Sequence, residues 1–196
     1  MRKILAASGV GAGIAAFVAL VLVVAALAFS VTVDGTSMEP TLKNGDRMFL
    51  EFWTHDEVER FDVVEADAPS AVFGGGTQIL KRVIGMPGDR VSVSPDARVL
   101  VRPAGEDETF VVENPAWSAE AGAEVEWLTV PEGAYWLLGD NWGASTDSRS
   151  FGFVDADAVH GRVVFRMLPL RRNGMITRDV RLAPVEPGAI FGSLSE

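Results

Sequence analysis

The chain of 196 residues contains no cysteine, and this absence removes several kinds of chemistry. Disulfides, thiolate metal sites and a cysteine nucleophile are all excluded. Histidine is nearly absent too, with only His55 and His160. His55 stands in a charged stretch and His160 beside a glycine, so a surface or structural role is expected for both. The sequence therefore predicts no Ser-His-Asp triad, no metal site and no cofactor.

Positive charge is also in short supply. Lys and Arg number 17 against 27 Asp and Glu, which gives a formal net charge of -10. Nucleic acid would repel such an acidic chain, so no nucleic-acid partner is expected. Apolar residues make up 48% of the chain, which suffices for one domain with its own core and a membrane anchor.

Charge is missing altogether from one long segment, because no charged residue lies between Lys3 and Asp34. The apolar run there exceeds the roughly 20 residues that span a hydrocarbon core, which predicts a transmembrane anchor at 8–31. Arg2 and Lys3 precede the span. The positive-inside rule therefore places residues 1–7 in the cytoplasm and the rest of the chain outside.

A cleavable signal peptide is the alternative interpretation of this segment. Ala26-Leu27-Ala28 has the small-x-small pattern of a cleavage site. The apolar run is, however, longer than the roughly 7–15 residues of a usual signal-peptide core, which favours the uncleaved anchor. The prediction is a single-pass protein of the cell membrane with an extracytoplasmic domain at 32–196.

That domain is predicted to be mainly β, with antiparallel sheets, because short β-branched runs alternate with turn signals and no sustained helical period follows residue 33. A weak helical turn around 155–159 is the exception. Residues 103–126 are expected to form a solvated acidic insertion, and the chain from Arg171 onward a tail with little regular structure. The strand candidates are 46–53, 63–64, 83–84, 91–93, 99–101, 110–112, 135–138 and 162–166.

Lysine is scarce enough to single out one residue. Only Lys3, Lys43 and Lys81 are present, the first on the cytoplasmic side and the second in a polar turn. In a strand, Lys81 shares a face with its apolar neighbours Ile79 and Val83. Burial of this kind lowers the pKa of an amine, and a neutral amine can act as a general base. A lysine that extends along an apolar strand toward water is the alternative.

A serine lies just beyond the predicted span, in the segment Asp34–Leu42. Ser37 can be a nucleophile without histidine if a neutral lysine takes its proton. A third segment, Gly139–Gly152, is a polar loop of small residues between two apolar strands. By itself such a loop is an ordinary turn.

Taken in order behind an N-terminal span, these three segments resemble the bacterial type I signal peptidases, the membrane-bound leader peptidases with a Ser-Lys dyad, in their compact single-span form. The resemblance covers roughly residues 8–166. The matching residues are Ser37-Met38-x-Pro40-Thr41-Leu42, Lys81-Arg82-Val83-Ile84-Gly85-Met86-Pro87-Gly88-Asp89, Gly139-Asp140-Asn141, Ser145-x-Asp147-Ser148-Arg149 and Phe151-Gly152-Phe153-Val154.

The resemblance implies a role for each matching residue. Ser37 would be the nucleophile and Lys81 the general base, while Ser145 would hydrogen-bond the lysine amine. Two ion pairs would brace the loop beneath the site: Asp140 with Arg82 and Asp147 with Arg149. The residues expected around the substrate are Val33, Gly35, Thr36, Met38, Leu42, Ile79 and Leu80.

Three positions depart from the family pattern. Gly35 stands where some members have a serine whose hydroxyl helps the nucleophile's backbone N–H to hold the oxyanion. Backbone donors, with Thr36 or water, are expected to replace it here. Trp142 stands where arginine is usual, and Phe61 where glycine is usual, so the fine shape of the site is expected to differ.

The implied substrates are secretory preproteins with Ala-x-Ala-like cleavage sites, added as an extended strand beside residues 31–36 and 77–81. The lipid bilayer is the second expected partner, and contact with the translocation channel is left open. Two alternatives also stay open. One is a specialised maturation peptidase or self-cleaving protease of the same dyad type. The other is a non-catalytic, membrane-anchored β-domain that binds exported segments.

Overall fold

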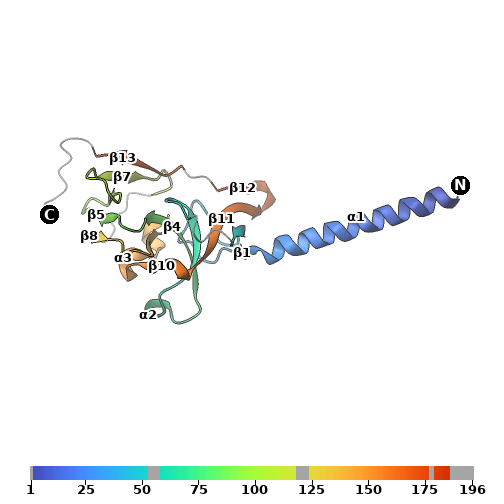
Figure 1. Cartoon of the computed structure of the whole chain (residues 1–196), viewed down its shortest axis with the longest axis horizontal. Helices are drawn as coiled ribbons and strands as arrows, with labels where there is room; N and C mark the ends of the chain where they lie inside the picture. The colour runs from blue at the N-terminus through green and yellow to red at the C-terminus, as the bar shows by residue number, and fades with distance from the viewer. Residues whose placement is uncertain (1, 53–57, 118–123, 177–178, 186–196) are drawn as a thin grey trace.

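The computed structural model describes residues 2–52, 58–117, 124–176 and 179–185, and the side chains among them from residue 11 onward. A single long helix, α1 (Arg2–Ala28), projects from a β-rich domain (Figure 1). The helix ends short of the predicted boundary at 31 because β1 begins at Ser30. His55 and Trp53 lie outside the described residues.

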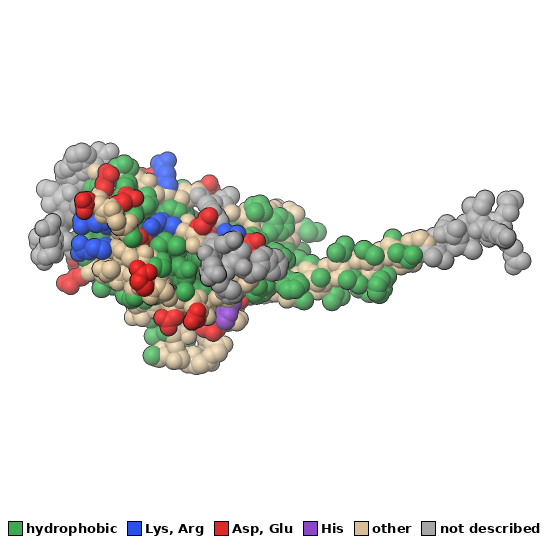
Figure 2. All heavy atoms as spheres, viewed as in Figure 1, with side chains coloured by type: hydrophobic (Ala, Val, Ile, Leu, Met, Phe, Trp, Pro, Cys, Tyr) green, Lys and Arg blue, Asp and Glu red, His purple; other side chains and the backbone are tan. Residues whose placement is uncertain are grey.

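Helix α1 is long and apolar enough to cross a membrane. None of its segment Gly11–Ala28 is buried in the domain, and apolar side chains cover it (Figure 2). Exposure of a helix that is apolar on every face is unfavourable in water and favourable in hydrocarbon. An anchor and a signal sequence both have such a helix.

The first sheet carries the segments that were singled out in the sequence. Its strand order is β1-β2-β11-β3-β4-β9-β10, with β12 paired to β11, and neighbouring strands run antiparallel. The strands are β1 (Ser30–Thr32), β2 (Arg47–Glu51), β3 (Val63–Asp67), β4 (Gln78–Gly85), β9 (Ala134–Leu138), β10 (Val154–Asp155), β11 (Val159–Leu168) and β12 (Gly174–Met175).

The second sheet has the order β13-β7-β6-β5-β8 and is also antiparallel. Its strands are β5 (Arg90–Val93), β6 (Val99–Arg102), β7 (Phe110–Glu113), β8 (Val125–Thr129) and β13 (Arg181–Pro184). The prediction of a mainly β, antiparallel fold is confirmed. Helical turns are few: α2 (Ser70–Phe73), α3 (Ser148–Phe151), η2 (Trp142–Ala144), η3 (Ala156–Ala158) and η4 (Leu170–Arg172).

Two clusters of buried apolar side chains hold the two sheets together and fix the loop between β1 and β2. One lies between the sheets, where Trp136 and Leu138 of β9 pack with Val91 and Val93 of β5. Another holds the chain that follows α1, because Met38 packs there with residues of β2 and β11. The loop between β1 and β2 is therefore anchored by buried side chains.

Two expectations about irregular segments were wrong in part. Residues 103–126 contain β7, which pairs with β6 and β13, and Trp117 packs against the inter-sheet core. The chain after Arg171 adds β12 and β13 as short strands. Short strands at a sheet edge have little alternation of their own, so their pairing depends on partners that the local sequence does not show.

Candidate active site

Ser37 and Lys81 come from different parts of the first sheet. Ser37 lies in the loop after β1, and Lys81 lies within β4, between β3 and β9. The fold brings Lys81 Nζ to 2.9 Å from Ser37 Oγ and to 3.1 Å from the Leu80 carbonyl oxygen. A hydrogen-bonded Ser-Lys pair is thus built from residues far apart in the sequence.

The Lys81 side chain is buried, with 4% of its surface exposed. Ile79 and Val83, which alternate with it along β4, both belong to a buried apolar cluster. Burial lowers the pKa of the Lys81 amine to about 8, against a smaller opposing effect of the Asp147 carboxylate. The amine points into the protein. Near pH 8 it is neutral in a large fraction of molecules.

The pair opens into a cavity of about 560 Å³. Of the residues expected around the substrate, those that line it are Val33, Gly35, Thr36, Met38, Ile79 and Leu80. Leu42 does not line it, because its side chain is fully buried in the core cluster that contains Met48 and Leu50. The turn that bonds the Leu42 N–H to the Met38 carbonyl directs this side chain inward.

Sequence reasoning missed several residues of the cavity wall. They come from β3, from α2 and from the loop after β9: Glu65, Phe73, Ala144 and Thr146. Only Glu65 left a signal, since a single acidic residue interrupts the apolar run from Val63 to Ala66. The others lie in segments whose position depends on tertiary structure.

Gly139 allows the loop after β9 to approach the nucleophile closely. A Cβ at this position would lie 2.2 Å from Ser145 Oγ and 2.6 Å from the Ser37 carbonyl oxygen, so no larger residue fits without movement. Asn141 then fixes the nucleophile segment, because its backbone N–H donates to the Ser37 carbonyl at 2.9 Å and its side chain to the Thr36 carbonyl at 3.1 Å.

Ser145 lies at the back of this arrangement, against Gly139. Its hydroxyl is buried and has no hydrogen-bond partner within the described part of the chain. The structure therefore places Ser145 beside the site but does not join it to the Lys81 amine. Its orienting role stays a prediction.

Both ion pairs implied by the family resemblance are present. Arg82 contacts Asp140 at 2.6 Å with both side chains buried, and Arg149 contacts Asp147 at 2.8 Å. Asp147 also accepts the Gly139 N–H at 3.0 Å. Because hydrogen bonds to charged groups are stronger than neutral ones, the Arg82–Asp140 pair holds the loop against β4, and the contacts of Asp147 hold the loop itself together.

Two of the unusual positions have a structural explanation. Phe61 adopts φ +76°, a conformation that glycine reaches without strain, which explains why glycine is usual there. Trp142 is buried against the inter-sheet core, with the Arg149 guanidinium 4.8 Å from its ring centre. The Trp142 ring thus provides a packing surface at a position where the arginine of other family members would place a charge.

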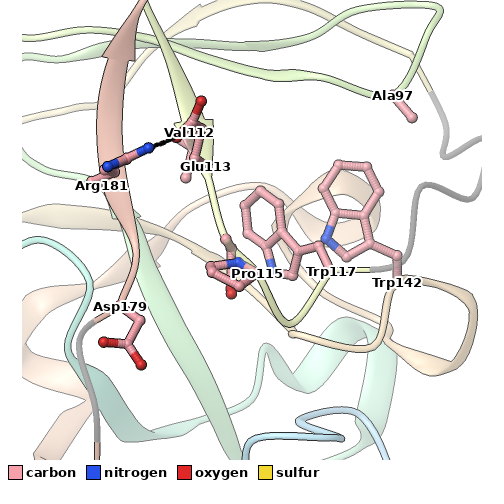
Figure 3. A pocket seen from close by; sticks show the side chains of 9 residues that line it. Ala97, Val112, Glu113, Pro115, Trp117, Trp142, Asp179 and Arg181 are labelled. Carbon is pink, nitrogen blue, oxygen red and sulfur yellow. Dashed lines mark hydrogen bonds and ion pairs between the residues drawn. The ribbon is translucent and has the colours of Figure 1, made fainter.

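A second cavity, of about 570 Å³, lies beside the second sheet and contains neither Ser37 nor Lys81. Trp117 and Trp142 form one side of it, and the ion pair of Arg181 with Glu113 lies across from them (Figure 3). Among the described residues, no group of three or more His, Cys, Asp or Glu side chains is placed to hold a metal ion.

Comparison with known proteins identifies the family. The family model of signal peptidase, peptidase S26, matches residues 6–168. The chain belongs to the signal peptidase family. The resemblance inferred from the three segments is thereby confirmed, together with the expectation of a hydrolase of the serine protease type.

Two relatives at more than 30% identity agree with this assignment. A probable signal peptidase I-2 of Synechocystis is 34% identical over 158 residues, covering 79% of this chain and 69% of that protein. Signal peptidase IB of Staphylococcus aureus is 32% identical over 168 residues, covering 79% and 85%. The crystal structure of a signal peptidase I from Enterococcus faecalis is similar with a TM-score of 0.44 and 28% identity, over 55% of this chain and 97% of that one.

Proposed function

We propose that the chain is a membrane-bound serine endopeptidase that removes N-terminal signal peptides from exported preproteins. The observation that carries this proposal is the 2.9 Å contact between the buried Lys81 amine and the Ser37 hydroxyl, inside a cavity with room for a peptide. Family membership supplies the reaction class, and this contact supplies a nucleophile with a base.

The mechanism follows from the protonation state of Lys81. The neutral amine accepts the Ser37 proton while Ser37 Oγ bonds to the scissile carbonyl carbon. The resulting ammonium then protonates the leaving amine as the peptide C–N bond breaks, which leaves an acyl-enzyme. A water molecule, deprotonated by the same amine, hydrolyses the ester and returns Ser37 and Lys81 to their starting forms.

Negative charge develops on the substrate oxygen during both steps. Among the described residues no hydrogen bond uses the Ser37 backbone N–H, so it can donate to this oxyanion. Gly35 has no hydroxyl to add, and its N–H donates to Asn44 at 3.0 Å. Loss of one oxyanion donor typically costs about 100- to 1,000-fold in rate, so backbone donors or water must provide the second.

An extended substrate fits between two free strand edges. Along residues 78–81, β4 pairs with β3 on one side, and within the described residues β9 joins its other side only from Arg82 onward. In the part of the chain that the structure describes, β1 pairs with β2 and with no other strand. A peptide can therefore add its backbone beside both edges, with alternate side chains directed into the cavity.

The position of Ser37 suits cleavage close to a bilayer. Helix α1 ends at Ala28. At roughly 3.3–3.6 Å per extended residue, Ser37 lies no farther than roughly 30 Å from that point. With residues 1–7 in the cytoplasm, the catalytic domain would face the outer side, where a signal peptide leaves the membrane.

Purified full-length protein in lipid vesicles is expected to cleave a precursor that has an Ala-x-Ala site. The matched control is the same precursor with tryptophan in place of the last alanine, which a pocket for small side chains should exclude. Gel mobility and mass spectrometry of the product give the site of cutting. Cleavage of neither precursor, combined with binding of both, would favour a non-catalytic scaffold instead.

The pH dependence should follow Lys81. A base acts only when deprotonated, and its pKa is about 8, so kcat/KM should rise with pH and reach half of its plateau near that value. The profile is measured from about pH 6 to about pH 10, with circular dichroism at each pH as a control for folding. A flat profile below pH 9 would argue against a titrating amine.

A further inference from the structure

An unused carboxyl group lies in the wall of the dyad's cavity. Glu65 belongs to β3 and pairs with Leu80 of β4. Residues that lie opposite each other in an antiparallel pair project to the same face of the sheet. Glu65 and Leu80 therefore point the same way, and both line the cavity that contains Ser37 and Lys81.

The Glu65 side chain is buried and has no hydrogen-bonded or ion-paired partner among the described residues. Its exposed fraction is 6%. Burial raises the pKa of Glu65, His160 lowers it and Asp67 raises it further. His160 itself is paired with Asp67, at 2.8 Å, so it does not neutralise Glu65 by contact.

Among the described residues, the fully buried side-chain atoms that lack a hydrogen-bond partner do not include the Glu65 oxygens, so its carboxyl group reaches the cavity. Val64 and Ala66, its neighbours along β3, are fully buried and project to the opposite face of the sheet, so they do not surround the Glu65 carboxyl group. An unpaired carboxyl that opens into a substrate cavity is ready to accept a hydrogen bond from a ligand. Both the ionised and the protonated carboxyl can accept one.

We propose that Glu65 selects substrates that carry a hydrogen-bond donor, a hydroxyl or a cationic group, on a side chain that enters the cavity. This inference rests on the proposed function, because it assigns specificity to the same site. The part of the wall formed by Leu80, Ile79 and Met38 is apolar and distinguishes side chains by size, while other parts of the wall carry polar side chains, among them Asp34 and Gln78. Glu65 adds a chemical distinction between side chains of equal shape, such as threonine and valine.

The test uses matched substrate pairs that differ by one hydroxyl. Precursor peptides carry Thr or Val at the third residue before the cut, or Ser or Ala at the first, since alternate side chains of a strand share a face. For the unaltered protein, kcat/KM should favour the hydroxyl-bearing peptide by roughly tenfold at one of the two positions. In Glu65→Val this ratio should fall to about one or below, and in Glu65→Gln, which keeps an acceptor, it should stay above one.

The ratio is compared within each variant, so differences in overall activity or stability cancel. An equal ratio in the unaltered protein and in Glu65→Val would overturn the proposal, as would a ratio near one at both positions. The same pairs are also titrated against Ser37→Ala by fluorescence. If no peptide is cleaved, the proposed function fails, while the ratio of the two Kd values still decides the role of Glu65.

Discussion

Replacing Lys81 by methionine is expected to abolish cleavage of a precursor peptide while the protein remains folded. Methionine keeps the approximate length and volume of the lysine chain but cannot accept the Ser37 proton. Removal of a general base and of serine activation together should reduce kcat/KM by at least about a thousandfold. Ser37→Ala should cause a similar loss, and the double variant should be no worse, because the two groups act as a unit.

The same substitution should raise stability at neutral pH. The Lys81 pKa falls from 10.5 to about 8 on folding, which corresponds to an unfavourable contribution of about 3 kcal/mol to the free energy of folding. This penalty is complete below about pH 8, where the folded protein must bury the charged amine. It declines as the pH rises toward 10.5, because the unfolded chain then loses the proton as well.

Urea unfolding of the unaltered protein and of Lys81→Met at neutral and high pH checks this expectation. The variant should be the more stable at pH 7, and the difference should shrink by about pH 10.5. Rapid cleavage by Lys81→Met would defeat the dyad mechanism. A folded, inactive variant of lower stability would still agree with Lys81 as the general base. It would contradict the inferred cost of burying the Lys81 amine.

The dyad could be predicted because its two residues are unusual where they stand. Lys81 is the one lysine of the chain in an apolar strand, and Ser37 lies a short distance after the apolar helix, which ends at Ala28. What the sequence could not supply is their 2.9 Å contact, which depends on the order of strands in the first sheet. Register across several strands is a tertiary property, and no local pattern encodes it.

The residues that sequence reasoning misplaced have a common physical basis. Leu42 belongs to a matching motif yet is buried in the core, because a motif does not say which way a side chain points. Trp117 lies in a stretch rich in polar residues, but its ring packs 5.0 Å from that of Trp142. Its indole N–H also reaches Asp140 at 3.3 Å, a contact between distant segments that composition cannot reveal.

Asp140 joins three parts of the molecule at one carboxylate. It pairs with Arg82 of β4, which is next to the base in the sequence. It also accepts a hydrogen bond of 2.6 Å from the hydroxyl of Thr41, which belongs to the nucleophile segment. It also accepts hydrogen bonds from Asn114, at 3.1 Å, and Trp117, which precede the described part of β8. The carboxylate thus holds the segments that carry Ser37 and Lys81 in a fixed relation.

Asp140→Ala is therefore expected to destabilise the protein by about 3–5 kcal/mol, because it leaves the buried Arg82 guanidinium without its counter-charge. Asp140→Asn keeps the shape and part of the hydrogen bonding, so its effect should be smaller. The matched control is Asp96→Ala, which breaks a partly exposed pair with Arg98 and a hydrogen bond from the Ser94 hydroxyl, and should cost about 1 kcal/mol. Urea denaturation measures all three.

A second comparison separates stability from positioning. Replacing Arg82 by methionine together with Asp140→Leu removes both charges, so it should restore much of the stability lost in Asp140→Ala. Cleavage should not recover in parallel, because the hydrogen bond from Thr41 would still be missing and the nucleophile segment would be held less firmly against β4. Equal destabilisation by Asp140→Ala and Asp96→Ala, or full cleavage by the double variant, would show that the buried pair does not position the dyad.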